Sequence, residues 1–138
     1  MARRAPGAVR AEKRWVRGDA RKLSQVTGLG GPALAAVRRL EAGRFWPGAL
    51  REALDRYERF LRVPGRYLSL PACPCCDPLA DRDTVEEFLN ALPPRARREL
   101  RAVVAPLDAE FERRTLPDPG VANPPWSSGW WHRRLSDP

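Results

Sequence analysis

Apolar residues recur at helical spacing most clearly over residues 47–62. Leu50, Leu54, Tyr57 and Leu61 stand at i, i+4, i+7 and i+11, so they share one face of a helix. Acidic residues precede basic residues by four positions in three pairs, which are Glu52–Arg56, Asp55–Arg59 and Glu58–Arg62. Each such pair stabilises a helix by about 0.3 kcal/mol. The pattern therefore predicts a helix here, which a Pro-Gly pair ends.

Three further stretches keep a helical period. Over residues 23–42, Pro32 suits the first turn of a helix and a glycine suits its end. Over residues 83–92, Asp83 is placed to cap the helix by accepting hydrogen bonds from its first amides. A proline pair then starts a helix that continues to about Arg114. The apolar positions of these three helices are Leu34, Val37, Leu40, Val85, Phe88, Leu89, Leu92, Ala96, Leu100, Val103, Val104, Leu107 and Phe111.

No stretch shows the alternation typical of a strand, so we expect an all-α fold. The expected architecture is a small bundle of four or five helices with a basic N-terminal arm and a Pro/Trp-rich C-terminal tail. The arm covers residues 1–22, the helical domain residues 23–114 and the tail residues 115–138. Three prolines interrupt residues 66–82, which we interpret as an irregular connection that contains the cysteines.

Positive charge is concentrated in the first half of the chain. The 138 residues carry a formal net charge of +8. Residues 1–72 contain 16 Lys and Arg against 6 Asp and Glu, whereas residues 73–138 contain 9 against 11. A polyanion would therefore dock on the first half, by Coulomb attraction and release of its counterions. A merely solvated surface is the alternative, since a GC-rich bacterial genome also favours arginine, which outnumbers lysine 23 to 2.

The charge pattern gives a set of candidate phosphate contacts. In the arm and beyond it they are Arg3, Arg4, Arg10, Lys13, Arg14, Arg17, Arg21, Lys22, Arg38 and Arg39. Three aromatic residues near them, Trp15, Phe45 and Trp46, could stack on bases where strands are open. Packing in the core is the alternative role for these rings.

A glycine turn lies among these residues. The segment V-T-G-L-G-G-P-A-L-A-A-V, residues 26–37, resembles the helix-hairpin-helix motif through Gly28, Leu29 and Gly30. The resemblance implies that backbone amides of Gly28, Gly30 and Gly31 bind DNA phosphates without reading sequence. Thr27 and Leu34 depart from that motif, which usually has proline and alanine there. The segment also resembles a helix-turn-helix, and a tight turn within a bundle is the third interpretation.

The cysteines form one cluster. Cys73, Cys75 and Cys76 lie within four residues, and His132 is the only histidine. Together they are candidate ligands for zinc, although zinc sites usually take ligands from paired turns. A redox element and buried small apolar side chains are the alternatives. The chain lacks a phosphate loop, a metalloprotease motif and a Ser/His/Asp order, so we expect no enzyme and no cofactor other than zinc.

Three tryptophans mark the tail. Trp126, Trp130 and Trp131 either strap the helical core or anchor a protein partner, because tryptophan is frequent in interface hot spots. No apolar run reaches about 20 residues and no signal peptide is apparent, so we expect a cytoplasmic protein without a membrane partner. The leading hypothesis is a small nucleic-acid-binding accessory protein. The alternative is a helical protein-interaction module with a metal or redox element.

Overall fold

Four α-helices make up most of the described chain. The computed structural model describes residues 22–70, 77–120 and 129–135. Its elements, in order, are α2 (Gly31–Arg44), α3 (Ala49–Leu61), α4 (Leu79–Ala91), α5 (Pro94–Arg113), β1 (Leu116–Pro117), the 3₁₀ helix η2 (Trp130–Arg133) and β2 (Arg134–Leu135). The all-α expectation is confirmed. The two short strands were not expected; they pair antiparallel and join the tail to the chain after α5.

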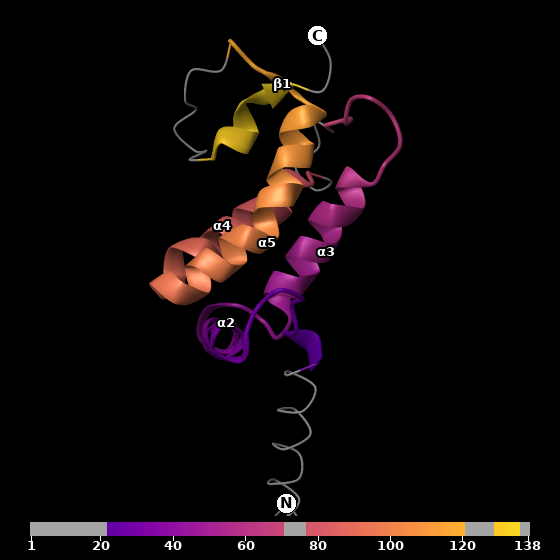
Figure 1. Cartoon of the computed structure of the whole chain (residues 1–138). Helices are drawn as coiled ribbons and strands as arrows, with labels where there is room; N and C mark the ends of the chain where they lie inside the picture. The colour runs from indigo at the N-terminus through magenta and orange to yellow at the C-terminus, as the bar shows by residue number, and fades with distance from the viewer. Residues whose placement is uncertain (1–21, 71–76, 121–128, 136–138) are drawn as a thin grey trace, which may run out of the picture.

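The helices form a bundle with one crossing helix. α3, α4 and α5 run along the length of the molecule, and α2 lies across one end of them (Figure 1). α2 contacts all three of the other helices. The main core lies between the four helices and contains Val37, Leu50, Val85, Phe88 and Leu100. These positions belong to the apolar faces that the sequence pattern predicted.

A second apolar cluster closes the opposite end of the bundle. Tyr57, Leu61, Leu68, Phe111 and Trp131 are all buried in it. Here the tail crosses back over the ends of α3 and α5. The tail therefore completes the core at the end of the bundle away from α2 (Figure 1).

The start of α4 differs from the sequence prediction. The helix begins at Leu79, and not at Asp83. Asp77 accepts a hydrogen bond from the Leu79 amide at 2.9 Å, so this carboxylate satisfies an amide of the first turn. Asp83 lies one turn further on, where its side chain is available to another partner.

Arginine side chains close the C-terminal ends of three helices. Arg97 donates to the carbonyl of Leu92 at 3.0 Å, just after α4. Arg114 donates to the carbonyl of Leu61 at the end of α3 and to those of Val63 and Gly65 in the turn that follows, the last at 2.7 Å. Arg134 donates to the carbonyl of Glu112 at 2.8 Å, in the last turn of α5. Guanidinium groups suit these places because the last carbonyls of a helix lack partners and form the negative end of its dipole.

A buried carboxylate joins α2 to α3. The side chain of Glu41 is 2% exposed and accepts hydrogen bonds from the Ser24 hydroxyl and from the amides of Gly48, at 3.1 Å, and Leu50, at 3.4 Å. α3 has no side-chain cap of its own, so Glu41 supplies one from the neighbouring helix. Glu41 follows Val37 by four positions and therefore occupies the apolar stripe of α2.

We expect Glu41→Ala to destabilise the fold strongly. The substitution leaves a buried hydroxyl and two amides without their acceptor, which costs roughly 3 kcal/mol in the free energy of unfolding. Urea unfolding followed by circular dichroism measures the loss. Glu58→Ala is the control, because it removes an exposed carboxylate whose ion pair contributes about 0.5 kcal/mol. Equal losses in the two variants would contradict the proposed role of Glu41.

Candidate nucleic-acid interface

The glycine turn is a tight contact between α2 and α5. Gly28 has a φ of +95°, and a Cβ atom there would lie 2.8 Å from Cγ2 of Val103. Both facts require glycine at this position. The amide of Gly30, the residue that precedes α2, donates to the Glu99 carboxylate at 2.8 Å. The turn is therefore built around contacts within the chain.

Glu99 occupies the position that the helix-hairpin-helix resemblance assigns to a phosphate. A carboxylate at the N-terminus of a helix uses the same amide and the same dipole as a phosphate. Arg95 lies 3.6 Å from Glu99 and neutralises part of its charge. Pro32 has no amide hydrogen to offer. A phosphate bound at Gly30 would have to displace Glu99.

The outward side of α2 carries positive charge only. Arg39 and Arg44 are exposed and Arg38 is half-buried, while Glu41, the single acid of the helix, faces the interior. In the described residues, no carboxylate lies within 4 Å of these three guanidinium groups. The arginines of α3 differ, because most of them pair with acids of their own helix; Arg51 and Asp55, for example, are 3.7 Å apart. Within the described residues, the α2 arginines therefore have no carboxylate that neutralises them.

The arm joins the bundle beside the C-terminal end of α2. Arg51 donates to the carbonyl of Lys22 at 3.0 Å. Leu23 lies against Gly48, where a Cβ atom would be 3.0 Å from that of Leu23. The first described residue of the arm thus meets the turn between α2 and α3. The other candidate arm residues, Arg3, Arg4, Arg10, Lys13, Arg14, Arg17 and Arg21, lie outside the described residues.

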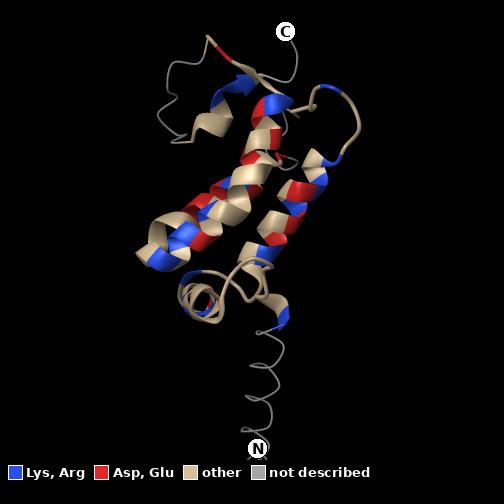
Figure 2. Ribbon diagram, viewed as in Figure 1, with Lys and Arg blue, Asp and Glu red and all other residues tan. Residues whose placement is uncertain are grey.

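More arginines lie at the beginning of α5. Arg95, Arg98 and Arg101 are exposed there, and this part of the helix lies at the same end of the bundle as α2 (Figure 2). Sequence reasoning did not include them, because they belong to the half of the chain whose total charge is negative. The packing of α5 against α2 places them at the same end of the bundle as the arginines of α2.

The two described aromatic candidates have different environments. The ring of Phe45 stacks on Phe88 with centroids 4.3 Å apart, so Phe45 belongs to the core. Trp46, the next residue, is exposed. Trp15 lies outside the described residues.

A buried ionic cluster at the other end of the bundle was missed by sequence reasoning. Arg82 is 4% exposed and makes two hydrogen bonds to Asp108, at 2.9 and 3.0 Å, and one to Glu86 at 2.9 Å. The Trp131 ring lies over the guanidinium, 4.0 Å from its carbon. Tyr57 donates its hydroxyl proton to Asp108 at 3.2 Å. One sign was present, since Arg82 precedes an apolar position of α4 by three residues and so shares its buried face.

Trp130 and Trp131 belong to the tail segment 129–135, which packs across the second apolar cluster and is called the strap. Asp83 accepts a hydrogen bond from Nε1 of Trp131 at 2.8 Å and lies 2.7 Å from Nε2 of His132. Trp130 packs against Phe111, with ring centroids 5.9 Å apart. These contacts agree with the strap alternative, and partner binding through either ring would have to compete with them. Trp126 lies outside the described residues.

The zinc hypothesis stays a prediction. Cys73, Cys75 and Cys76 lie outside the described residues. In the part of the chain that the structure describes, no three His, Cys, Asp or Glu side chains are grouped as a metal site. A zinc ion bound to Nε2 of His132 would replace the contact of this nitrogen with Asp83.

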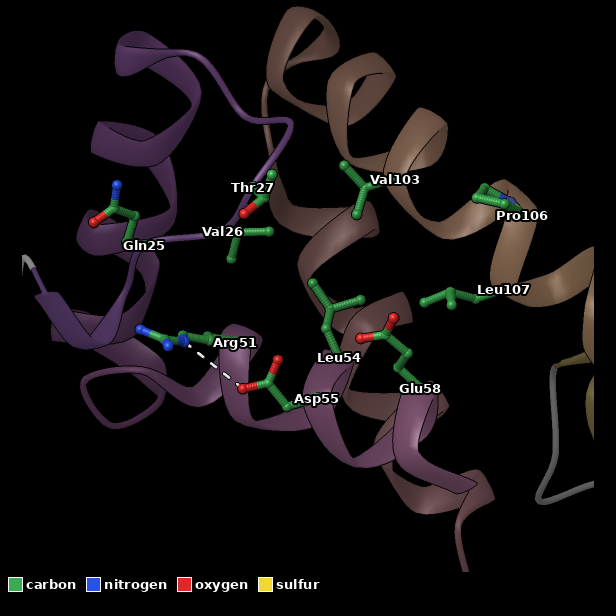
Figure 3. A pocket seen from close by; sticks show the side chains of 10 residues that line it. All are labelled: Gln25, Val26, Thr27, Arg51, Leu54, Asp55, Glu58, Val103, Pro106 and Leu107. Carbon is green, nitrogen blue, oxygen red and sulfur yellow. Dashed lines mark ion pairs between the residues drawn. The ribbon is translucent and has the colours of Figure 1, made fainter. Parts of the chain in front are cut away.

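A groove of about 500 Å³ opens between α3, α5 and residues 25–27 (Figure 3). Its apolar lining includes Leu54, Val103 and Leu107, whose side chains face one another from the two helices. Asp55 and Glu58 form an acidic edge, and Asp55 pairs with an arginine at 3.7 Å. This concave surface suits a side chain of a protein partner better than a phosphate.

No match to this chain was found among protein-family models, curated proteins or solved structures. The likeness of the glycine turn to known motifs therefore rests on the residues of the turn alone. Within the residues that the structure describes, no helix has the length and apolar character needed to cross a bilayer.

We expect Tyr57 to make the fold sensitive to alkali. Burial and the neighbouring Asp108 carboxylate raise the pKa of Tyr57 far above its usual range. The folded state therefore keeps the proton, whereas the unfolded state releases it above about pH 10. This contribution to stability is complete below pH 10 and is lost as the pH rises further, by about 1.4 kcal/mol per pH unit.

Urea unfolding at pH 7, 10, 11 and 12 checks this expectation. Tyr57→Phe loses about 1 kcal/mol at pH 7 with its hydrogen bond, but its stability should fall less steeply above pH 10. Other groups titrate in both proteins and cancel in the comparison. Parallel curves for the two proteins would show that the phenol of Tyr57 is not responsible.

We expect Asp83→Ala to loosen the strap. Nε1 of Trp131 and Nε2 of His132 lose their common partner, which favours the open strap by about 1.4 kcal/mol, or tenfold. Trypsin cleavage after Arg133 and Arg134, followed by mass spectrometry, should speed up to the same extent. Glu87→Ala is the control, since it removes an exposed carboxylate of the same helix. An unchanged cleavage rate in Asp83→Ala would mean that Asp83 does not hold the strap.

Proposed function

We propose that this chain is a small nucleic-acid-binding accessory protein of the cytoplasm, which contacts phosphates through its basic arm and the outward side of α2. One observation carries the proposal. α2 turns its only carboxylate, that of Glu41, into the interior and leaves Arg38, Arg39 and Arg44 without an acidic partner among the described residues. Guanidinium groups that no described carboxylate neutralises favour a polyanion, because each phosphate contact releases condensed counterions.

The proposed contacts read charge and not sequence. Residues at the N-terminal end of α2, where a recognition helix would read bases, are glycine, proline and alanine, which offer almost no hydrogen-bonding side chains. Arginines on the helix surface bind phosphate oxygens in any sequence. We therefore expect weak sequence preference and a strong dependence on salt.

The glycine turn has a different role in this proposal from the one that the motif resemblance implies. Gly28 and Gly30 hold α2 against α5 through Val103 and Glu99. The arginines of α2 and the arm then carry the phosphate contacts. The proposal assigns no reaction to the chain and needs no cofactor.

We expect Arg38→Gln together with Arg39→Gln to weaken DNA binding about tenfold at physiological salt. Removing two phosphate contacts should also lower the slope of log K against log salt by about 1.8 for a duplex. Fluorescence anisotropy with a labelled mixed-sequence duplex, titrated at several salt concentrations, measures both quantities. A competing RNA of matched sequence shows which nucleic acid binds more tightly.

A matched double variant distinguishes the loss of local phosphate contacts from the loss of total positive charge as the cause of weaker binding. Arg62→Gln with Arg113→Gln removes the same two charges from exposed arginines that pair with Glu58 and Glu110. These residues line the surface near the end of α3, away from α2. Equal effects of the two double variants would contradict a binding surface on α2, and absence of binding by the wild-type protein would contradict the proposed function itself.

The groove between α3 and α5 supports a second candidate function, binding of a protein partner. Leu54, Val103 and Leu107 give this groove an apolar lining that remains open in the described structure. In this alternative, the cysteine cluster acts as a metal or redox element and Trp126 contributes to docking. It becomes the leading hypothesis if the wild-type protein fails to bind nucleic acid at physiological salt.

A further inference from the structure

Two exposed hydrophobic side chains flank the point where the arm joins the bundle. Leu23 is 51% exposed and Trp46 is 53% exposed, and only Val63 is comparable among the large hydrophobic residues that the structure describes. Leu23 contacts Gly48, two residues after Trp46. Two of the three large exposed hydrophobic side chains of the described residues therefore lie near this turn. An exposed tryptophan in such a cluster marks a binding site more often than an isolated one does.

A hydrogen bond from the indole nitrogen holds the ring of Trp46 in place. Nε1 of Trp46 donates to Glu52, in the first turn of α3, at 2.9 Å. Phe45 packs on Phe88 in the core, and the side chain of the next residue, Trp46, is exposed to solvent. In the described part of the chain, no aromatic ring stacks on Trp46 and no cation lies over it. A ring that is fixed by its edge nitrogen keeps its flat faces available to a planar ligand.

Basic residues lie near this ring along the chain and in the fold, although the charged group that touches the ring itself is the Glu52 carboxylate. Arg44 precedes it by two residues, and Lys22, the last residue of the arm, accepts a hydrogen bond at its carbonyl from Arg51, which also pairs with Asp55. An aromatic platform between basic side chains is the arrangement by which proteins bind unpaired nucleotides, with bases on the ring and phosphates on the cations. Bases inside a duplex already stack on their neighbours and cannot use such a ring.

We infer that Trp46 stacks on an unpaired base, and that single-stranded nucleic acid is the preferred ligand of this chain. The inference rests on the proposed function, and it specifies the class of nucleic acid. Stacking of one base on an aromatic ring contributes about 1–3 kcal/mol, whatever the base. The platform therefore adds affinity for single strands without adding sequence preference.

The test compares a single strand with its duplex in the full chain. We expect Trp46→Ala to lower the affinity for a fluorescein-labelled single strand of about 20 nucleotides by roughly 5- to 100-fold. The affinity for the duplex of the same sequence should change by less than about twofold, since its bases are not available. Trp46→Phe should keep most of the single-strand affinity, because phenylalanine still offers a flat aromatic face. Val63→Ala removes an equally exposed apolar side chain elsewhere and should change neither affinity.

Tryptophan fluorescence gives a second measurement that does not depend on the stability of the alanine variant. Stacking of a base should quench the emission of the wild-type protein when unlabelled oligothymidine is added, and Trp46→Phe should lose that part of the quenching. If wild-type protein binds neither DNA, the proposed function fails and the inference fails with it. If it binds both, but Trp46→Ala weakens both equally or neither, the proposed function stands and the stacking role is wrong. Equal quenching in wild type and Trp46→Phe, or equally weak binding by Trp46→Phe and Trp46→Ala, would also overturn the inference.

Discussion

The inward carboxylate of Glu41 connects the stability of this bundle to the charge of its surface. By binding Ser24 and the first amides of α3, it fixes the angle between α2 and α3 and the position of the chain just after the arm. The same orientation removes the only negative charge from the outside of α2. A hydrogen bond network that the fold needs therefore also produces the cationic helix face that the proposed function uses.

Two groups of the described arginines have different physical roles. Arg82 and Arg114 are buried, and with Arg97 and Arg134 they bind carboxylates or helix carbonyls. Removing any of these would leave carbonyls or carboxylates without partners in low-dielectric surroundings. The second group lies on α2 and at the start of α5, where Arg39, Arg44, Arg98 and Arg101 are exposed and have no carboxylate within 4 Å among the described residues. Net charge alone counts both groups, although the buried guanidinium groups of the first are not accessible to an external polyanion.

Local sequence patterns predicted the helices well, because helix formation depends on neighbours three or four positions apart. The stripe from Leu50 to Leu61 gave α3 almost to its ends, and Arg38 and Arg39 were correctly expected on a helix. The role of Asp83 was predicted wrongly because its partners, Trp131 and His132, are 48 and 49 residues away. The contact of Glu99 with the glycine turn was missed for the same reason, since its partner, Gly30, is 69 residues away in the sequence. Contacts of this range leave no periodic trace, so the sequence could suggest the basic residues of the site but not the carboxylate that occupies its glycine turn.

The positions of the acidic side chains determine from which side a polyanion would approach the proposed interface. α4 carries Asp81, Asp83, Glu86 and Glu87 against the single Arg82, which is itself buried and paired. In the proposed function, this helix repels a polyanion and α2 attracts it, so the field of the bundle would orient an approaching strand toward the end where the arm joins the bundle. The second apolar cluster, the strap and the ionic cluster around Arg82 lie at the other end (Figure 1). The groups that hold the tail and the candidate binding groups thus occupy opposite ends, which leaves the exposed arginines and Trp46 little constrained by the packing of the tail.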